Sequence, residues 1–278
     1  MKLCVSLYSL HPYITSGEMD VAGALEFLHS EGVEYVELLD LYLPTPQLRA
    51  EARELLDRYS MKAGAYAASN EFAAVAPEAL EGEISRLKQA IRIAAEFETR
   101  TVRVFAGNRS AEADRSFDQA LAQIIDSLKQ CTAAALENGV TLCLENHGLL
   151  AGKSGQVRAI LDGVGSPALQ ATADTGNFLI ADEAPLAAVR ALSGCIGHVH
   201  FKDMKQVAAG GFAAPGGRRY LGTALGEGEV PLGSIVELLK ESGYDGCVSI
   251  EYEAPQKDGC REALTRSIRS TRSLLGLK

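Results

Sequence analysis

The sequence predicts a single (β/α)8 TIM barrel of the α/β class, with residues 1–278 forming one domain. Eight strand-like runs alternate with eight helix-like runs along the chain, which is the pattern of a parallel sheet with crossover helices. Eight such units suit the ~250 residues of a typical closed barrel better than an open doubly wound sheet. The chain also lacks a Gly-x-Gly-x-x-Gly motif after its first strand-like run, which weakens the dinucleotide-binding alternative.

The expected strands are short runs of apolar or branched residues, and the expected helices are longer runs between them. The strands are Leu3–Tyr8, Tyr35–Leu39, Ala63–Ala67, Thr101–Phe105, Thr141–Glu145, Leu169–Ala173, Gly197–Phe201 and Val248–Tyr252. The helices are Val21–Glu31, Thr45–Tyr59, Pro77–Glu98, Ala113–Asn138, Gly155–Gly163, Ala184–Leu192, Pro231–Ser242 and Gly259–Leu275. Gly139 and Gly243 stand just past two of these helices, where a left-handed residue ends a helix.

The composition predicts a soluble globular enzyme rather than a membrane or disordered protein. Hydrophobic residues make up 47% and charged residues 23% of the chain, and the net charge is −9 without a basic block, so we expect no nucleic-acid partner. We find no apolar stretch long enough for a bilayer and no secretory signal, so we expect a cytoplasmic protein without a membrane partner. The six cysteines have no metal-type spacing, which predicts free thiols.

Polar side chains end several of the predicted strands. Glu145, Asp174, His200 and Glu251 each stand at or near the tip of a different strand. In the fifth strand Leu142 and Leu144 alternate with polar neighbours that end on Glu145, so the polar parity is the one that faces into the barrel. Since barrel active sites lie at the C-terminal ends of the strands, these four side chains are expected to meet there.

Three carboxylates and one imidazole without thiolates favour one divalent metal ion. Mn²⁺ is the preferred candidate, with Mg²⁺, Co²⁺ or Zn²⁺ as alternatives, and such an ion would offset the repulsion among buried acids. Each residue taken alone has a simpler explanation, because an acid at a strand end is often a helix cap or an ion-pair partner. The metal interpretation depends on all four residues together.

Five motifs, in order along the chain, carry a family resemblance. They are Leu144-Glu145-Asn146-His147, Asp174-Thr175-Gly176-Asn177, Gly197-His198-Val199-His200-Phe201-Lys202-Asp203, Gly226-Glu227-Gly228-Glu229-Val230 and Ile250-Glu251-Tyr252-Glu253. In this order they resemble the sugar phosphate isomerase/epimerase family with the xylose-isomerase-like TIM barrel. The likeness covers nearly the whole chain and is specific to the superfamily rather than to a substrate.

The resemblance implies a metal held by Glu145, Asp174, His200 and Glu251, in the manner of ketose 3-epimerases. In those enzymes the two glutamates act from opposite faces of the substrate carbon, so Glu145 and Glu251 are the catalytic candidates here. An enediolate forms when one of them removes a proton that the other returns, and the ion lowers the barrier by polarising the ketone. The expected function is therefore a metal-dependent isomerase or epimerase of a ketose or related keto-polyol.

Other residues near the motifs are candidates for substrate contacts. Asn177 replaces the His that ketose epimerases carry three residues after the metal Asp, and Arg219 resembles their substrate-contacting Arg with a longer spacing. His147 is expected to bind substrate or to cap the loop before Gly148. Glu37 on the second strand is expected to contact substrate or to support the site, with an ion pair to Arg103 as the alternative.

Lys202 is a further catalytic candidate because it shares the inward parity of His200. The Lys202-Asp203 pair is similar to the branch of the family that contains inosose dehydratases, in which such a lysine could protonate a leaving hydroxide. A salt bridge from Lys202 to Glu229 or Asp203 is the alternative. The glycine-rich stretch Ala208 to Gly228 is expected to form a mobile flap over the barrel mouth.

Two other functions remain open at this point. A metal-dependent lyase of the inosose-dehydratase type would remove water from a keto-polyol after the same first proton abstraction. A non-catalytic sugar-binding barrel would not need two opposed glutamates. In each case the partner is a small sugar or polyol, and Leu277 near the end of the chain could join a homo-oligomer interface.

Overall fold

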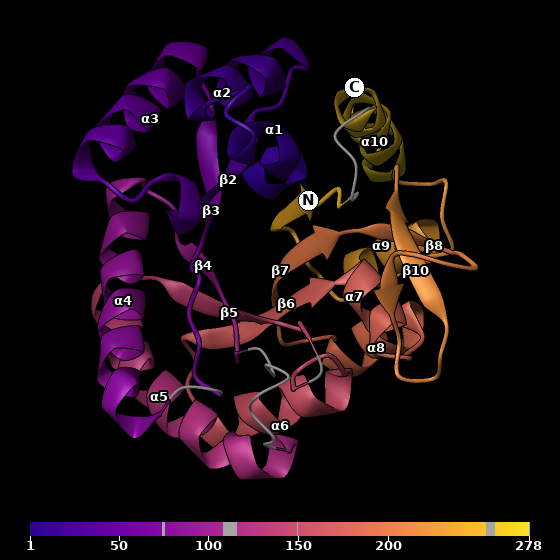
Figure 1. The fold of residues 1–278 in the computed structure, drawn as a ribbon. Coiled ribbons are helices and arrows are strands. Elements are labelled where there is room, and N and C mark those ends of the chain that lie inside the picture. Colours follow the sequence, from indigo (N-terminus) through magenta and orange to yellow (C-terminus); the bar gives the residue numbers. More distant parts are fainter. Residues whose placement is uncertain (74–75, 108–115, 149, 254–258, 278) are drawn as a thin grey trace.

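Eight parallel strands close into a barrel in this computed structural model, which describes residues 1–73, 76–107, 116–148, 150–253 and 259–277 (Figure 1). The strand order around the barrel is β1-β11-β7-β6-β5-β4-β3-β2, so the first and last strands pair. The barrel strands are β1 (Lys2–Ser6), β2 (Tyr35–Leu39), β3 (Lys62–Ala67), β4 (Thr101–Val104), β5 (Thr141–Glu145), β6 (Leu169–Asp174), β7 (Ile196–Phe201) and β11 (Cys247–Ile250). The predicted TIM barrel is therefore confirmed.

Helices surround the barrel and cover its apolar outer surface (Figure 1). They are α2 (Val21–Ser30), α3 (Pro46–Tyr59), α4 (Pro77–Glu96), α5 (Phe117–Glu137), α6 (Ser154–Val164), α8 (Pro185–Leu192), α9 (Leu232–Glu241) and α10 (Cys260–Leu275). Gly139 and Gly243 have φ angles of 63° and 77°, as expected after the ends of α5 and α9. The predicted start of the fourth helix, Ala113, lies outside the described residues; that helix is α5 here.

The outward parity of the strands builds the main hydrophobic core. Val36 and Leu38 of β2, and Leu142 and Leu144 of β5, are fully buried in one core cluster that also contains helix residues such as Leu128. Each such side chain removed from water contributes about 1.5–3 kcal/mol. This core fixes the strands in register, and it leaves the opposite parity for the barrel interior.

Short elements that the alternation does not predict occur at the C-terminal ends of the strands. The 3-10 turn η1 (Leu7–Leu10) and helix α1 (His11–Thr15) follow β1, η2 (Asp40–Tyr42) follows β2, and α7 (Thr175–Ile180) follows β6. They shorten the first predicted strand, which ends at Ser6 instead of Tyr8. All of them lie at the end of the barrel where the polar strand tips gather.

A small antiparallel sheet replaces most of the expected flap. Strands β8 (Asp203–Gln206), β10 (Arg219–Thr223) and β9 (Phe212–Ala213) pair in that order, beside α7 in Figure 1. Met204 and Tyr220 are buried in a separate apolar cluster with Ala214, against which Leu179 and Ile180 of α7 pack. The glycines of this stretch therefore shape the turns of a packed sheet, which the sequence analysis did not foresee.

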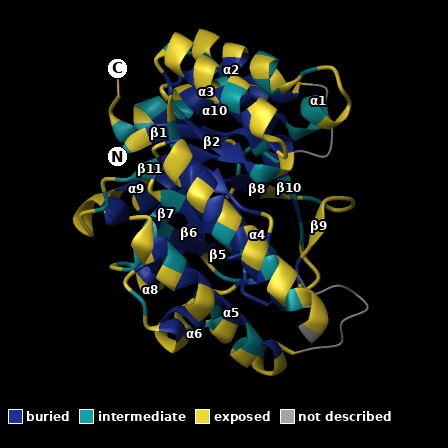
Figure 2. Ribbon diagram, turned by 90° about the vertical axis from the view of Figure 1, so that its left-hand side faces the viewer, coloured by how far each residue is buried: buried dark blue, intermediate teal, exposed yellow. Residues whose placement is uncertain are grey.

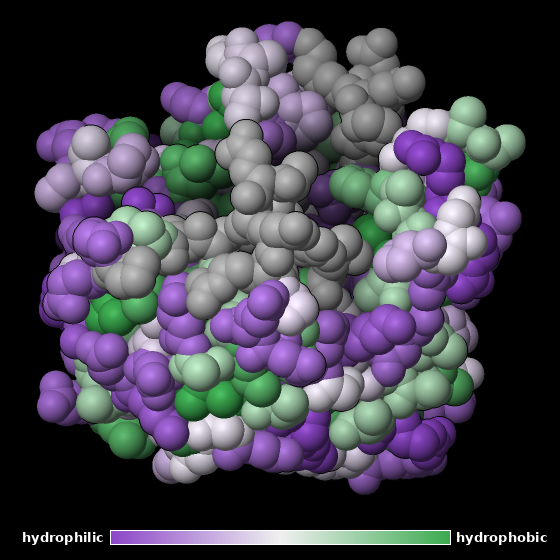
Figure 3. Space-filling model, turned by 60° about the horizontal axis from the view of Figure 1, so that its bottom comes forward, coloured by the Kyte–Doolittle hydropathy of each residue, from purple (hydrophilic) through white to green (hydrophobic). Residues whose placement is uncertain are grey.

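The lengths of the helices and the character of the surface relate to the expected absence of a membrane partner and to the expected homo-oligomer. Among the described helices, none combines the length and the apolar character needed to cross a bilayer. The face drawn in Figure 3 carries mostly hydrophilic side chains, with hydrophobic ones in small groups. Leu277 is 41% exposed, so the homo-oligomer interface stays a prediction. All six cysteines are free thiols, as predicted.

Candidate metal centre

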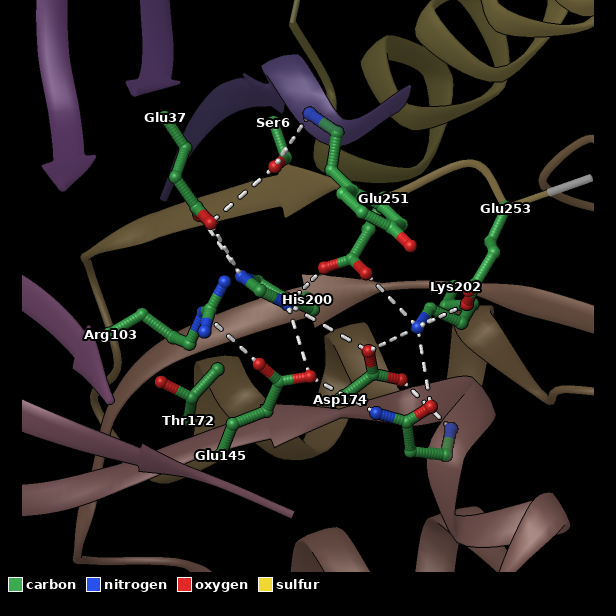
Figure 4. Close-up of polar contacts among 12 residues, drawn as sticks. Ser6, Glu37, Arg103, Glu145, Thr172, Asp174, His200, Lys202, Glu251 and Glu253 are labelled. Atoms are coloured by element: carbon green, nitrogen blue, oxygen red, sulfur yellow. Dashed lines mark hydrogen bonds and ion pairs between the residues drawn. The ribbon is translucent and has the colours of Figure 1, made fainter. Parts of the chain in front are cut away.

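Four side chains from four strand ends converge inside the mouth of the barrel (Figure 4). Glu145, Asp174, His200 and Glu251 each offer one ligand atom, and these atoms lie within 4.8 Å of one another. Nδ1 of His200 lies 2.6 Å from a Glu251 oxygen, 3.7 Å from Asp174 and 3.8 Å from Glu145. All four residues are buried, and Glu251 is the most exposed of them at 7%. The structure thus brings together the four residues that the sequence analysis grouped.

Asp174 serves two purposes at once. Its Oδ1 accepts hydrogen bonds from the backbone N–H groups of Gly176 (2.9 Å) and Asn177 (2.8 Å), which caps helix α7. Its Oδ2 turns toward His200. The helix-cap explanation therefore holds for one oxygen, while the other oxygen remains available to the cluster.

Glu37 orients the imidazole of His200 from behind. Nε2 of His200 lies 3.0 Å from Oε2 of Glu37, so this nitrogen carries the proton and donates it to the carboxylate. Nδ1 faces the other three ligand atoms and is the nitrogen that would bind an ion. His198 also donates to Glu37 at 2.7 Å, and the alternative ion pair between Glu37 and Arg103 is wrong.

Arg103 contacts Glu145 instead. Nε of Arg103 lies 3.2 Å from Oε2 of Glu145, and the amide of Asn177 donates to Oε1 at 3.0 Å. Both oxygens of Glu145 therefore have a fixed neighbour on the protein. The strand pattern contained a signal for Arg103, because it has the inward parity of β4 and pairs in register with Cys143 of β5.

Lys202 is buried beside the cluster and does not bind either of its expected partners. Its Nζ lies 3.1 Å from Asp174 Oδ2, 3.1 Å from Glu251 Oε1 and 3.0 Å from Glu253 Oε2. It also donates to the side-chain oxygen of Asn177 at 3.2 Å. The predicted salt bridges to Glu229 and Asp203 are therefore wrong. Glu253 was missed, although it shares the parity of Glu251 two residues earlier.

The charges at this site leave room for a divalent cation. Four buried carboxylates (Glu37, Glu145, Asp174, Glu251) face the buried cations Lys202 and Arg103 and the imidazole of His200. Burial lowers the pKa of His200, but Glu37 and Glu251 raise it well above its usual value, so the imidazole shares in offsetting the acids. An ion that took the place of the imidazole proton would face acids that exceed Lys202 and Arg103 by two negative charges. Oδ2 of Asp174 and Nδ1 of His200 are buried without a hydrogen bond of acceptable geometry. Buried charges without compensation are costly. The donor set and its charge therefore fit a divalent ion with oxygen and nitrogen ligands.

The surrounding charges favour the ionised forms of the acids. Burial raises the pKa of Glu251, but Lys202 and His200 outweigh this and hold the pKa well below its usual range. Burial also raises the pKa of Glu37, but His200 and His198 outweigh this and hold it well below its usual range. Burial lowers the pKa of Lys202, whereas Asp174 and Glu251 raise it well above normal. The carboxylates are thus available as ligands or bases, and Lys202 is a protonated amine.

Two other predicted substrate contacts lie outside this cluster. His147 is half-buried after β5, and its ring centroid lies 4.6 Å from that of Phe105, whose ring also lies 4.0 Å from the guanidinium carbon of Arg103. Arg219 belongs to β10 and donates to the backbone oxygens of Gly210 and Gly211. A substrate role for these two residues stays a prediction.

The TIM barrel gathers carboxylate and imidazole side chains at its C-terminal mouth, the end at which the active sites of TIM-barrel enzymes lie. The sequence model of the xylose isomerase-like TIM barrel family matches residues 25–273, so the chain belongs to that family. The resemblance stated from the motifs is thereby confirmed. Sugar epimerases and isomerases are among the structural neighbours.

Individual relatives are similar at different levels. An inosose dehydratase from Lacticaseibacillus casei is 34% identical over 87 residues, which is 29% of this chain and 29% of that protein. The IOLI protein with a bound zinc atom has a TM-score of 0.80 at 19% identity, over 99% of this chain and 98% of that one. A D-tagatose 3-epimerase-like protein has a TM-score of 0.79 at 21% identity, over 99% and 97% of the two chains. The two structural likenesses, at this identity, show the fold.

Proposed function

We propose that the protein is a divalent-metal-dependent isomerase or epimerase of a ketose or related keto-polyol. The observation that carries this proposal is the convergence of Glu145, the last residue of β5, and Glu251, the residue after β11, on one cluster with Asp174 and His200. Strands β6 and β7 separate β5 from β11 in the barrel, so the two glutamates approach the cluster from different sides. A substrate held between them would meet a carboxylate on each face.

The metal would be held by Glu145, Asp174, His200 and Glu251, with Mn²⁺ as the favoured ion. Three carboxylate oxygens and one imidazole suit a hard or borderline cation, and zinc in the similar IOLI protein supports a divalent ion of some kind. When bound, the ion would polarise the substrate ketone and its neighbouring hydroxyl. Glu37 would position His200 from behind, because it is fully buried and both of its oxygens face imidazoles.

Glu251 is the stronger candidate for the first proton abstraction. Its Oε1 contacts the amine of Lys202, which also faces Asp174 and Glu253, whereas both oxygens of Glu145 are held by Arg103 and Asn177. Glu145 would return the proton from the other face of the resulting enediolate. Each carboxylate must come within about 3 Å of the proton that it moves.

The remaining candidates would bind the substrate's oxygen atoms. Asn177 lies between Glu145 and Lys202, where its amide fixes both side chains and could exchange one contact for a substrate hydroxyl. His147, beside Phe105 at the mouth, would add a hydrogen bond and an adjacent apolar surface. Arg219 would reach the substrate from the small sheet if its contacts with Gly210 and Gly211 were released.

A dehydratase is the second candidate function, and Lys202 favours it. The protonated amine lies between Glu251 and Glu253, so it could donate a proton to a leaving hydroxide after the same first abstraction. The local identity with an inosose dehydratase supports this alternative. The two reactions differ only after the enediolate, in whether the carbon is reprotonated or the β-hydroxide leaves.

Solvent-exchange measurements test the proposal and separate it from the alternatives. The protein is incubated with Mn²⁺ in deuterated water with free ketoses and inososes in turn, and each sugar is followed by NMR and mass spectrometry. An epimerase or isomerase incorporates deuterium at carbon without loss of mass as water, whereas a dehydratase gives a product lighter by one water. Glu251→Gln should abolish either change while retaining ligand binding. Binding without exchange for every sugar, in the unsubstituted protein, would favour a sugar-binding barrel instead.

A further inference from the structure

A cavity lies at the opposite end of the barrel from the metal centre. Its volume is about 800 Å³, and it is lined by the first residues of several strands, among them Lys2, Gly64, Gly197 and Cys247. In Figure 2 the starts of β1 and β11 lie toward the left, away from the small sheet of β8–β10 at the right. The cavity therefore opens on the face that the proposed reaction does not use.

Two glycines without pairing partners widen this end of the barrel. Val36 pairs with Ala63 and Glu37 with Ala65, which leaves Gly64 as the extra residue of a β-bulge, and Gly197 has the same position in β7. A Cβ on Gly64 would lie 2.9 Å from Sγ of Cys4 and 3.0 Å from Sγ of Cys247. The space that a side chain at position 64 would need is thus occupied by the thiols of Cys4 from β1 and Cys247 from β11.

The two thiols are not equivalent. Cys4 is fully buried and donates its S–H to the sulfur of Cys247, which is partly exposed in the cavity wall. This hydrogen bond lowers the pKa of Cys247. Burial raises that pKa, and the positive charge of the nearby Lys2 lowers it further. Cys195 is also partly exposed, but burial raises its pKa and it donates to the carbonyl of Leu192. Of these two partly exposed thiols, Cys247 is the one whose surroundings favour the thiolate.

The charge of the cavity differs in sign from that of the chain. Four basic and three acidic side chains line it, whereas the chain as a whole carries −9. Arg53 and Glu96 form one weak pair at 3.9 Å on its rim. Lys2 lies next to the thiol, because it pairs in register with Cys247 across β1 and β11. A ligand with carboxylate groups would therefore be attracted here rather than to the average surface.

We propose that Cys247 is a modification site for an anionic low-molecular-weight disulfide that enters this cavity. The Cys247 thiolate attacks one sulfur of the disulfide, forms a mixed disulfide and expels the other half as a thiolate. The Cys247 sulfur is oxidised and the expelled half is reduced, so electrons balance within the pair. Lys2 and the other basic side chains of the wall would hold the carboxylates of the bound half.

The first test uses the full chain and glutathione disulfide as the probe. Intact-mass spectrometry with peptide mapping should find one glutathionyl adduct, on Cys247, that dithiothreitol removes. Within the same sample Cys247 should be modified before Cys195, since the lowered pKa of Cys247 and the raised pKa of Cys195 give Cys247 the larger thiolate fraction. This internal comparison needs no variant. An adduct that forms first on any other cysteine, or no adduct at all, would overturn the proposal.

Matched variants and a second probe test the recognition of the anion. C247S should lose the adduct and C195S should keep it, and C247A replaces C247S if the latter does not fold. Cystamine, a cationic disulfide, should react with Cys247 more slowly than glutathione disulfide, although the net charge of the chain favours a cation. Lys2→Gln should reduce this preference. A faster reaction with cystamine would contradict an anion site.

Discussion

Glu37 accepts a hydrogen bond from Nε2 of His200 at 3.0 Å, although the two residues are 163 positions apart in the chain. The bond holds the imidazole with Nε2 on Glu37 and Nδ1 toward Glu145, Asp174 and Glu251, so that Nδ1 is the nitrogen that would bind an ion. A carboxylate behind a ligand imidazole is the arrangement that tunes metal affinity in many proteins. The affinity for an ion should therefore depend on a residue that does not touch it.

We expect Glu37→Gln to weaken Mn²⁺ binding about 10- to 100-fold, because the amide can no longer accept a charge-assisted bond from His200. Competition with a fluorescent chelator measures the affinity directly. Glu34→Gln, an exposed glutamate just before the same strand, is the matched control and should leave it unchanged. Equal affinities in all three proteins would show that Glu37 does not support the site.

Addition of a divalent ion should stabilise the fold, because the ion offsets the excess negative charge of the buried cluster. At a concentration 100 times the Kd the free energy of unfolding should rise by about 2.7 kcal/mol. Differential scanning calorimetry of chelator-treated protein, with and without Mn²⁺, measures the change. Asp174→Asn should remove the response and the exposed Asp162→Asn should keep it. An unchanged response in Asp174→Asn would exclude Asp174 as a ligand.

Lys202→Met should reduce turnover by about 10²- to 10⁴-fold, which is the usual contribution of a positioned proton donor. It should also lower the free energy of unfolding of the metal-free protein by about 3–5 kcal/mol, because Asp174 and Glu251 lose their buried cation. Mn²⁺ should recover part of this stability but not the turnover. Lys205→Met, on the exposed part of β8, is the control. Full turnover in Lys202→Met would exclude a catalytic role.

Gly176→Ala tests how tightly Lys202 is packed. A Cβ at this position would lie 2.6 Å from Cγ and 2.9 Å from Cβ of Lys202, so the lysine or helix α7 must move. We expect a loss of about 1–3 kcal/mol in chemical denaturation. Gly155→Ala in α6 meets open space and should be neutral or stabilising by about 0.4–1 kcal/mol. Similar stabilities for the two variants would mean that this contact is easily relieved.

Asp203→Asn should destabilise the segment that closes the small sheet. Oδ1 of Asp203 accepts from the N–H groups of Met204 and Val230, and Oδ2 accepts from those of Gly226 and Gly228. An amide NH₂ would face two of these four donors, so we expect a loss of about 1–3 kcal/mol. Urea denaturation measures it, with the exposed Asp245→Asn as the control. No difference between the two variants would show that the loop tolerates the lost acceptors.

The barrel and the four clustered residues could be predicted because they follow from local periodicity. Alternation along β5 gives the inward side of Glu145, and parallel strands bring all C-terminal tips to one end. The hydrogen-bond and ion-pair partners of the inward side chains could not be predicted in the same way. Glu37 was expected to contact substrate or support the site, with an ion pair to Arg103 as the alternative, but its partner His200 was not named. Which inward side chains meet depends on the stagger and bulges of the closed barrel.

The small sheet was missed for a different reason. Its strands are short, one of them only Phe212–Ala213, and they alternate with glycines that suggest an irregular loop. What stabilises them is the burial of Met204 and Tyr220 beside α7, and that contact has no local signature. The true partners of Lys202 were missed because Asp174, Glu251 and Glu253 come from two other parts of the chain.

Lys202 and Asp203 are consecutive, yet the first faces the carboxylates of the barrel mouth and the second anchors the loop that follows the small sheet. A single peptide unit thus joins the proposed proton donor to an insertion outside the barrel. Exchange of that insertion for one of another length would reposition the amine while the ligand strands stayed intact. The insertion between β7 and α9 is therefore the natural place to redirect the outcome of the reaction by protein engineering.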